Sequence, residues 1–344
     1  MDHNPYFITT NGKRSFCDLY TLATVTAIDM TTEAPPNVTA ACVLHDDSLL
    51  VATPSGIYSI NSELSAAVRV LSVPGAASLQ MVSAIQQVPS AADETFVLAD
   101  EGSNNIRLWD KTTASMTVVA GSRDGELGFE DGQRTSARFC KPHSLALLPD
   151  GSYAVSDSKS NCIRLLSRDG SVTTLAGGGG NGELGYVDGK GLEARFDWPQ
   201  GLAVDTDGSI LVCDSCNNVI RRVTRDGIVT TVAGNGLAGY VDASGEEASF
   251  DCPSDIVADC RGTIVVVDTD NYALRRLTKS GTHYEVSTIY CQNASGGDLF
   301  DFSGMHLLTI VLRNNGDLLL WNVDEAKDPA GMLLLSDTGL VRRD

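Results

Sequence analysis

The chain has 344 residues, and its 44 acidic residues outnumber its 25 lysines and arginines, which gives a formal net charge of −19. Nucleic-acid-binding proteins neutralise phosphates with Lys and Arg, so this balance argues against nucleic acid as a partner. Hydrophobic residues make up 42% of the chain, enough for a core, yet no run approaches the roughly 18 apolar residues of a membrane span. The composition therefore predicts an acidic, soluble, non-membrane protein.

The N-terminal segment MDHNPYFITT has neither the basic nor the apolar region of a secretory signal, which predicts a cytoplasmic location. Sequons at Asn37 and Asn293 keep a secreted protein, or a domain of a larger one, as the alternative. Nine cysteines in such a chain are expected to be small apolar residues or free thiols rather than a disulfide framework. Cys213 and Cys216 lack the second pair or the histidines of a structural zinc site, so no metal or cofactor is predicted.

The strand-like segments begin with Leu19–Thr24 (LYTLAT). Leu49–Ile60 (LLVATPSGIYSI) and Phe96–Trp109 follow with the rhythm of short antiparallel strands. Outer strands are expected at Val70–Val73 and Thr117–Ala120. These segments predict two irregular blades at the start of a repeat array.

One pattern then recurs three times between residues 123 and 277. A Gly-rich link with an aromatic residue and an acid (GFED, GYVD, GYVD) leads to ARF or ASF, then to a strand, an Asp-Gly turn or its equivalent, and a paired Asp and Arg. The strand-ending aspartates are spaced by 57, 57 and 54 residues, and an arginine follows each by seven: Asp100, Asp157, Asp214 and Asp268, with Arg107, Arg164, Arg221 and Arg275. A period near 55 with strand-like content predicts the blades of a propeller.

Turn chemistry divides each regular unit into four strands. In the third unit Asp150-Gly151 and Asp169-Gly170 mark tight turns, because these residues tolerate positive φ. The strands between the turns and loops are Ser144–Leu148, Tyr153–Ser156, Ile163–Leu166 and Val172–Ala176. Each blade is therefore predicted to be a four-stranded antiparallel meander.

The last strand-like segments are Leu307–Val323 and Met332–Ser336. A ring must close to avoid an unpaired edge, and Leu19–Thr24 supplies the missing strand of the sixth blade. The prediction is an all-β, six-bladed propeller of four-stranded blades closed by an N-terminal strand. It is a single domain over residues 1–344, with regular repeats at about 118–277 and degenerate blades 1, 2 and 6.

The regular units resemble the NHL repeat in the pattern VTT-[LV]-AG, G-[FY]-x-D, ARF, DG-x-[IY] and D-x-x-x-N-x-I-R. The resemblance is close over residues 118–277 and implies a β-propeller, most often with six blades. The repeated Asp and Arg are expected to be structural and to lie near one another, because Arg can pair with a carboxylate across the blade. The recurring Phe129, Tyr186 and Tyr240 are expected to plug between blades, while the acid two residues later caps its own turn.

The links and the Asp–Asn loops are predicted to share one face of the ring, here called the link face. The net charge of its three regular links falls from 0 (122–141) through −2 (178–198) to −4 (235–252). Function usually sits on loops held by a rigid scaffold. The candidate contact residues for a ligand or partner are His143, Trp198, Gln200, Ser254, Tyr186, Tyr240, Asp242, Glu246 and Glu247.

Three functions remain open. The first is a non-catalytic, monomeric scaffold that binds a protein or peptide of basic character. The second is a channel-centred lyase or lactonase-like hydrolase, because the segment around His143 resembles the peptidyl-hydroxyglycine amidating lyases, in which blade-start histidines bind zinc; Gln200 and Ser254 stand where the other ligands would be. The third is RNA binding, known among NHL proteins with a basic face and disfavoured here by the charge.

Overall fold

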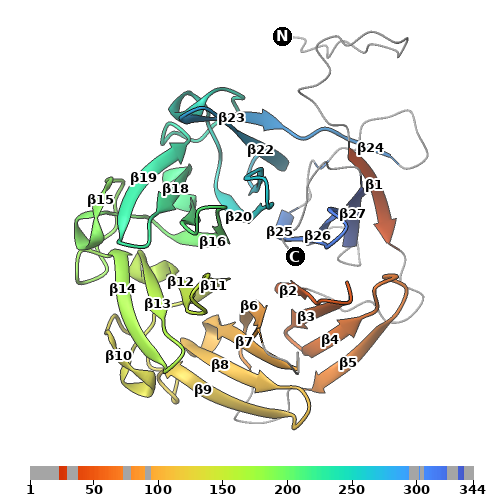
Figure 1. The fold of residues 1–344 in the computed structure, drawn as a ribbon, viewed down its shortest axis with the longest axis vertical. Helices are drawn as coiled ribbons and strands as arrows, with labels where there is room; N and C mark the ends of the chain where they lie inside the picture. The colour runs from red at the N-terminus through yellow and green to blue at the C-terminus, as the bar shows by residue number, and fades with distance from the viewer. Residues whose placement is uncertain are drawn as a thin grey trace.

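The fold is a ring of six small β-sheets around a central axis (Figure 1). The computed structural model describes residues 23–28, 38–72, 79–89, 94–293, 302, 306–323 and 332–336. Each sheet is one blade, with one inner strand nearest the axis and its other strands further out. The predicted all-β, six-bladed propeller is confirmed.

The first three blades follow one another along the chain. Blade 1 contains β2 (Ala40–Val43), β3 (Leu49–Thr53), β4 (Gly56–Ile60) and β5 (Ala67–Ser72). Blade 2 contains β6 (Val82–Gln87), β7 (Thr95–Asp100), β8 (Asn105–Asp110) and β9 (Ser115–Gly121). Blade 3 contains β11 (Pro142–Leu147), β12 (Tyr153–Asp157), β13 (Cys162–Leu166) and β14 (Ser171–Gly177).

The other three blades complete the ring. Blade 4 contains β16 (Pro199–Val204), β17 (Ile210–Asp214), β18 (Val219–Val223) and β19 (Ile228–Ala233). Blade 5 contains β20 (Pro253–Ala258), β21 (Ile264–Asp268), β22 (Ala273–Ser280) and β23 (His283–Thr288). Blade 6 contains β25 (His306–Leu312), β26 (Leu318–Val323), β27 (Met332–Ser336) and β1 (Ala23–Ile28).

The tight turns form as their residues require. Gly151 has a φ of 81°, in the left-handed region that glycine adopts without strain. Asp150 Oδ1 accepts a hydrogen bond from Ser152 N at 3.0 Å, and Leu148 N donates to Ser152 O at 2.8 Å. The Asp-Gly pairs therefore turn the chain as the sequence predicts.

In two blades the link before the blade supplies a fifth strand that the sequence did not predict. The link before blade 3 forms β10 (Gly132–Gln133), which pairs with β14, and the link before blade 4 forms β15 (Gly189–Lys190), which pairs with β19. Both short strands lie outside the outer strand of their blade (Figure 1). The links thus fold back over the rim of the ring, and this pairing satisfies backbone groups at an otherwise open sheet edge.

An N-terminal strand closes the ring, as predicted. β1 pairs antiparallel with β27, from Thr24 opposite Ser336 to Ile28 opposite Met332. The described strand overlaps the predicted Leu19–Thr24 at residues 23 and 24 and continues to Ile28, whereas residues 19–22 lie outside the described part. The outer edge of β1 also pairs in parallel with β24 (Cys291–Asn293), so blade 6 has five strands.

The hydrophobic core lies between neighbouring blades. Ala154 and Ile163 of blade 3 share one buried cluster with Ile210 and Val212 of blade 4. The middle strands are buried on both faces, as in β17, where all five residues are buried. Each blade thus buries its apolar side chains only against its neighbours, which makes the ring one cooperative unit.

Candidate functional site

The repeated arginine is the centre of a buried polar cluster in each regular blade. Arg221 is fully buried, and its guanidinium lies 2.7 Å from both Asp214 and Asp188. It also lies between two rings, with centroids 5.2 Å away at Tyr186 and 5.1 Å away at Phe196. Burying a charge is costly unless it is paired and hydrogen-bonded, and this arrangement provides both.

Two further blades repeat the cluster. Arg164 pairs with Asp157 at 3.0 Å and Asp131 at 2.8 Å, and Arg275 pairs with Asp268 and Asp242 at 2.7 Å. In blade 2 the pair is Arg107 with Asp100, at 3.0 Å. The rings that enclose the regular arginines are Phe129 and Phe139 for Arg164 and Tyr240 and Phe250 for Arg275.

The acid two residues after each link aromatic was expected to cap its own turn. This prediction is wrong, because the acid binds the repeated arginine of its blade. Asp188 binds Arg221 and accepts hydrogen bonds from the backbone and hydroxyl of Thr231, at 3.1 and 3.2 Å. Asp242 likewise pairs with Arg275 and accepts hydrogen bonds from the backbone and hydroxyl of Thr288. The acid therefore fastens the link to the two outer strands of its blade, and the charge of Asp242 is already compensated.

Each regular link forms a lobe at the rim. We call residues 122–141, 178–198 and 235–252 lobe 3, lobe 4 and lobe 5. The outer edges of Tyr186 and Tyr240 are exposed on lobes 4 and 5, although their faces pack on arginine. Glu246 and Glu247 are exposed on lobe 5.

An asparagine of each preceding blade fixes the residue before the blade-start proline. Asn161 Oδ1 accepts a hydrogen bond from Trp198 N at 3.0 Å, and Asn218 Oδ1 accepts one from Cys252 N at 2.9 Å. The matching bond in the earlier blade joins Asn104 to Lys141 N. These hydrogen bonds stabilise an uncommon backbone, because φ is 62° at Lys141, 55° at Trp198 and 52° at Cys252.

These residues bring charge and an aromatic ring close to the axis. The Lys141 ammonium lies 5.7 Å from the Trp198 ring centroid and 3.2 Å from Glu101 Oε1. Glu101 is buried, at 8% exposure, and lines the central cavity together with His143. Trp198 thus contacts a cation of its own chain, and Glu101 and Lys141 were not among the predicted contact residues.

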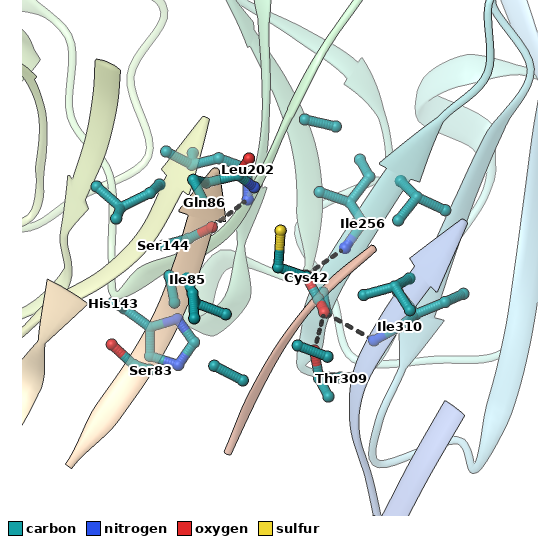
Figure 2. Close-up of a pocket in the computed structure, with 18 of the residues that line it drawn as sticks. Cys42, Ser83, Ile85, Gln86, His143, Ser144, Leu202, Ile256, Thr309 and Ile310 are labelled. Carbon is teal, nitrogen blue, oxygen red and sulfur yellow. Dashed lines mark hydrogen bonds between the residues drawn. The ribbon is translucent and has the colours of Figure 1, made fainter. Parts of the chain in front are cut away.

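The central cavity has a volume of about 490 Å³. All six inner strands contribute to its wall, and the labelled side chains in Figure 2 come from them. His143 lies on this wall next to Ser83 (Figure 2). Its Nδ1 is buried and has no hydrogen-bond partner among the described residues. Burial lowers the pKa of His143 below its usual value, so the imidazole is neutral near neutral pH.

A ladder of side chains joins the inner strands across the wall. Ser144 Oγ accepts a hydrogen bond from Leu202 N of the next blade, at 3.2 Å (Figure 2). The equivalent position in blade 4 is Gly201, which has no side chain to reach Ile256 N.

Asp255 accepts hydrogen bonds both from the amide of Ile256 and from the next inner strand, β25. Its Oδ1 accepts from Ile256 N at 2.9 Å, and its Oδ2 accepts from Ile310 N at 2.9 Å and Thr309 Oγ1 at 3.1 Å. Burial raises the pKa of Asp255 to about 6, against the opposing effect of these hydrogen bonds. Asp255 therefore remains mostly ionised at neutral pH.

We expect Gly201→Ala to lower the free energy of unfolding by about 1–3 kcal/mol, because overpacking forces the backbone to shift. An added Cβ would lie 2.6 Å from Asp255 Cα and 2.8 Å from Ser254 O. The matched control is Gly189→Ala, whose Cβ would meet its nearest atoms at 3.4 Å, an ordinary contact. Urea denaturation of both variants checks this, and equal midpoints would contradict it.

The predicted contact residues divide into separate groups. His143 lines the cavity, whereas Gln200 and Ser254 are absent from its lining, and Ser254 Oγ lies 2.6 Å from Thr269 Oγ1. Tyr186, Tyr240 and the lobe 5 acids lie at the rim. Within the described part of the chain, no three His, Cys, Asp or Glu side chains converge as a metal site would require.

The NHL repeat family model matches residues 139–164 and 196–222. Each range runs from the end of a lobe into the third strand of blade 3 or blade 4. The chain therefore contains NHL repeats within its β-propeller. Its eight described cysteines are free, and among them Cys213 is buried while Cys216 is exposed. No helix in the described part of this propeller is long and apolar enough to cross a membrane.

Two curated proteins are similar to part of this chain. The Arabidopsis thaliana protein SUPPRESSOR OF QUENCHING 1, chloroplastic, is 29% identical over 195 residues, 53% of this chain and 18% of the relative. The NHL repeat-containing protein 2 of Bos taurus is 33% identical over 153 residues, 41% of this chain and 21% of the relative. The matched regions thus make up about a fifth of these relatives.

Solved structures resemble the NHL propeller in fold. Virginiamycin B lyase from Staphylococcus aureus has a TM-score of 0.57 at 13% identity, covering 90% of this chain and 99% of that one. A putative gluconolactonase has a TM-score of 0.54 at 12% identity, covering 96% and 98%. At these identities the likeness concerns the fold alone.

Proposed function

We propose that this NHL propeller is a non-catalytic scaffold that binds a basic protein segment or peptide on lobes 4 and 5. The observation that carries the proposal is a group of exposed apolar side chains shared by these two neighbouring lobes. Leu184 is 64% exposed and Leu237 is 71% exposed. The others are Tyr186, Val187, Leu192, Tyr240 and Val241. Exposed apolar groups gathered in this way mark interaction surfaces.

The two lobes are in contact. A Cβ added at Gly236 of lobe 5 would lie 3.1 Å from Tyr186 Cε1 of lobe 4. The exposed edge of the Tyr186 ring thus adjoins the first residues of lobe 5, two of which, Leu237 and Tyr240, are highly exposed. The apolar residues of both lobes can therefore be contacted by one partner segment.

Lobe 5 lacks an ion pair that lobes 3 and 4 both contain. Glu126 pairs with Arg138 at 2.9 Å in lobe 3, and Glu183 pairs with Arg195 at 2.9 Å in lobe 4. The sequence places Leu237 and Ser249 at the corresponding positions of lobe 5. An apolar residue at 71% exposure in place of a surface ion pair adds nothing to the core, which favours a role in binding.

The charge of the surface suits a basic partner. Lobe 5 contains four acids and no base, and Glu246 and Glu247 are exposed there, unlike Asp242, which Arg275 compensates. Complementary charge steers association and selects partners more than it adds affinity. RNA would be repelled by the same surface.

The channel enzyme is supported less well. The cavity and the unpartnered Nδ1 of His143 favour it, and propeller enzymes share the fold. The described residues nevertheless provide a single imidazole on the cavity wall and no converging metal ligands. Catalytic zinc needs three protein ligands with one open position.

The test is selection of binders from a randomised peptide library displayed on phage. We expect basic peptides with apolar anchors, whose affinity falls about tenfold or more in the double variant Leu184→Ser/Leu237→Ser, because central apolar anchors each contribute more than about 1 kcal/mol. Affinity should also fall as NaCl rises from about 0.05 to about 0.5 M, where exposed charges are screened.

The matched control is Leu127→Ser on lobe 3. Leu127 occupies the repeat position of Leu184 and has the same 64% exposure, so it tests whether any exposed leucine suffices. Selected peptides that bind the double variant as tightly as the parent protein would show that the surface is elsewhere. Absence of any enriched peptide would count against a peptide-binding function.

A further inference from the structure

The central cavity contains more negative charge than positive charge. Its wall includes the carboxylates of Glu101 and Asp255, and none of its described lining residues is Lys or Arg. Lys141 pairs with Glu101 at 3.2 Å. Asp255 is partly exposed, has three hydrogen-bond donors and pairs with no cation among the described residues. One carboxylate on the cavity wall is therefore uncompensated.

The surroundings of Asp255 make this charge costly. Leu202, Ile256 and Ile310 lie on the same wall, and apolar surroundings disfavour an ionised carboxylate. Four lone-pair positions are available on a carboxylate, and the described donors occupy three of them. A cation that enters the cavity can take the fourth position and neutralise the charge.

The cavity favours an organic cation over a metal ion. No three His, Cys, Asp or Glu side chains of the described residues converge as metal ligands, so the carboxylates act as separate charges. A wall with Val43, Leu145 and Val257 suits a hydrocarbon stem, which buries apolar area while its charged end reaches a carboxylate.

We propose that the central cavity binds one alkylammonium or alkylguanidinium group, with its charge beside Asp255 and its stem along the apolar inner strands. Two sources share this chemistry. One is a Lys or Arg side chain of the partner segment, and in that case the inference rests on the proposed function. The other is a free amine of small-molecule size, which requires no docking on the lobes.

The inference gives a definite pH dependence. With a pKa of about 6, Asp255 is ionised to about one-tenth at pH 5 and about nine-tenths at pH 7, so affinity for a cation should rise about ninefold between them. The other titratable groups of the cavity wall are Glu101, His143 and Cys42, and those on the strands packed against β20 are Cys213, Asp214, Asp268 and His306. Protonation of His143 at low pH opposes a cation, so it acts in the same direction.

The first experiment uses n-pentylamine and the uncharged 1-pentanol as probes in isothermal titration calorimetry. We expect one site for the amine, an affinity higher at pH 7 than at pH 5 by about ninefold, and a loss of about tenfold or more in Asp255→Asn. The matched control Glu63→Gln removes the same formal charge from the exposed turn between β4 and β5 of blade 1 and should bind as the parent does. Equal binding of amine and alcohol, or an affinity that does not change with pH, would overturn the inference for the free amine.

The second experiment identifies the source and protects against a variant that does not fold. Peptides selected on the lobes are resynthesised with each Lys or Arg replaced in turn by norleucine. A loss of affinity for one such peptide in the parent protein, greater at pH 7 than at pH 5, identifies a side-chain cation. If no lysine or arginine matters in this way and pentylamine also fails, the inference is wrong. Because Leu184→Ser/Leu237→Ser alters only the lobes, failure of the proposed function is measured separately.

Discussion

Replacing Arg221 by methionine should lower the free energy of unfolding by about 3–5 kcal/mol, the cost of leaving buried charges without their partner. Asp214 is fully buried and would lose a 2.7 Å ion pair. Asp188 would lose the cation that holds its link against the blade, and the rings of Tyr186 and Phe196 would lose the guanidinium between them. Chemical denaturation followed by tryptophan fluorescence measures the change.

The neighbouring Arg222 provides the control. It points to the other side of β18 and pairs with the half-exposed Asp207, a surface ion pair of the kind that contributes about 0–1 kcal/mol. Arg222→Met should therefore change stability little. A loss of less than about 1 kcal/mol in Arg221→Met would mean that the buried cluster does not stabilise the blade.

Deleting residues 1–28 should open the ring and cause aggregation or a loss of several kcal/mol of stability. The deletion removes β1, which forms five residue pairs with β27. Met332, Leu333 and Leu335 on β27 are buried and would lie on an unprotected edge strand, and such edges promote association between chains. Size-exclusion chromatography and thermal unfolding are the measurements.

A protein that lacks only residues 1–22 isolates the contribution of β1, because the strand begins at Ala23. If the longer deletion is as soluble and as heat-stable as this shorter one, β1 is not needed for closure. The comparison thus tests closure itself rather than the effect of shortening the chain.

Much of the fold follows from local chemistry that the sequence displays directly. Asp-Gly pairs such as Asp150-Gly151 specify tight turns by backbone conformation alone, and the constant offset between Asp214 and Arg221 reflects a contact between adjacent strands of one blade. The closing strand was found because LYTLAT repeats an outer-strand pattern, although the strand continues to Ile28, four residues beyond its predicted end. A sequence pattern does not fix register, which depends on the partner strand.

The site was harder to predict because it depends on contacts between residues far apart in the sequence. Asp188 reaches Arg221 and Thr231, which lie 33 and 43 residues further along the chain, and the local sequence suggested a turn cap instead. Asp255 and Glu101 meet the same cavity from blades 5 and 2. The available signal was an acid within the apolar inner strand PSDIVA, where the other regular blades have Ser144 and Gly201.

The residues before the blade-start prolines have a left-handed backbone that does not depend on their own side chains. Asn161 and Asn218 fix the backbone of Trp198 and Cys252 through main-chain hydrogen bonds, so the side chains there are not needed to hold the fold. Lys, Trp and Cys already occupy the three equivalent positions. Positive φ excludes β-branched residues in practice, but most others fit. Positions 141, 198 and 252 are therefore suitable sites for libraries of substituted variants. Such variants can change which ligand or partner is bound there while the propeller fold is kept.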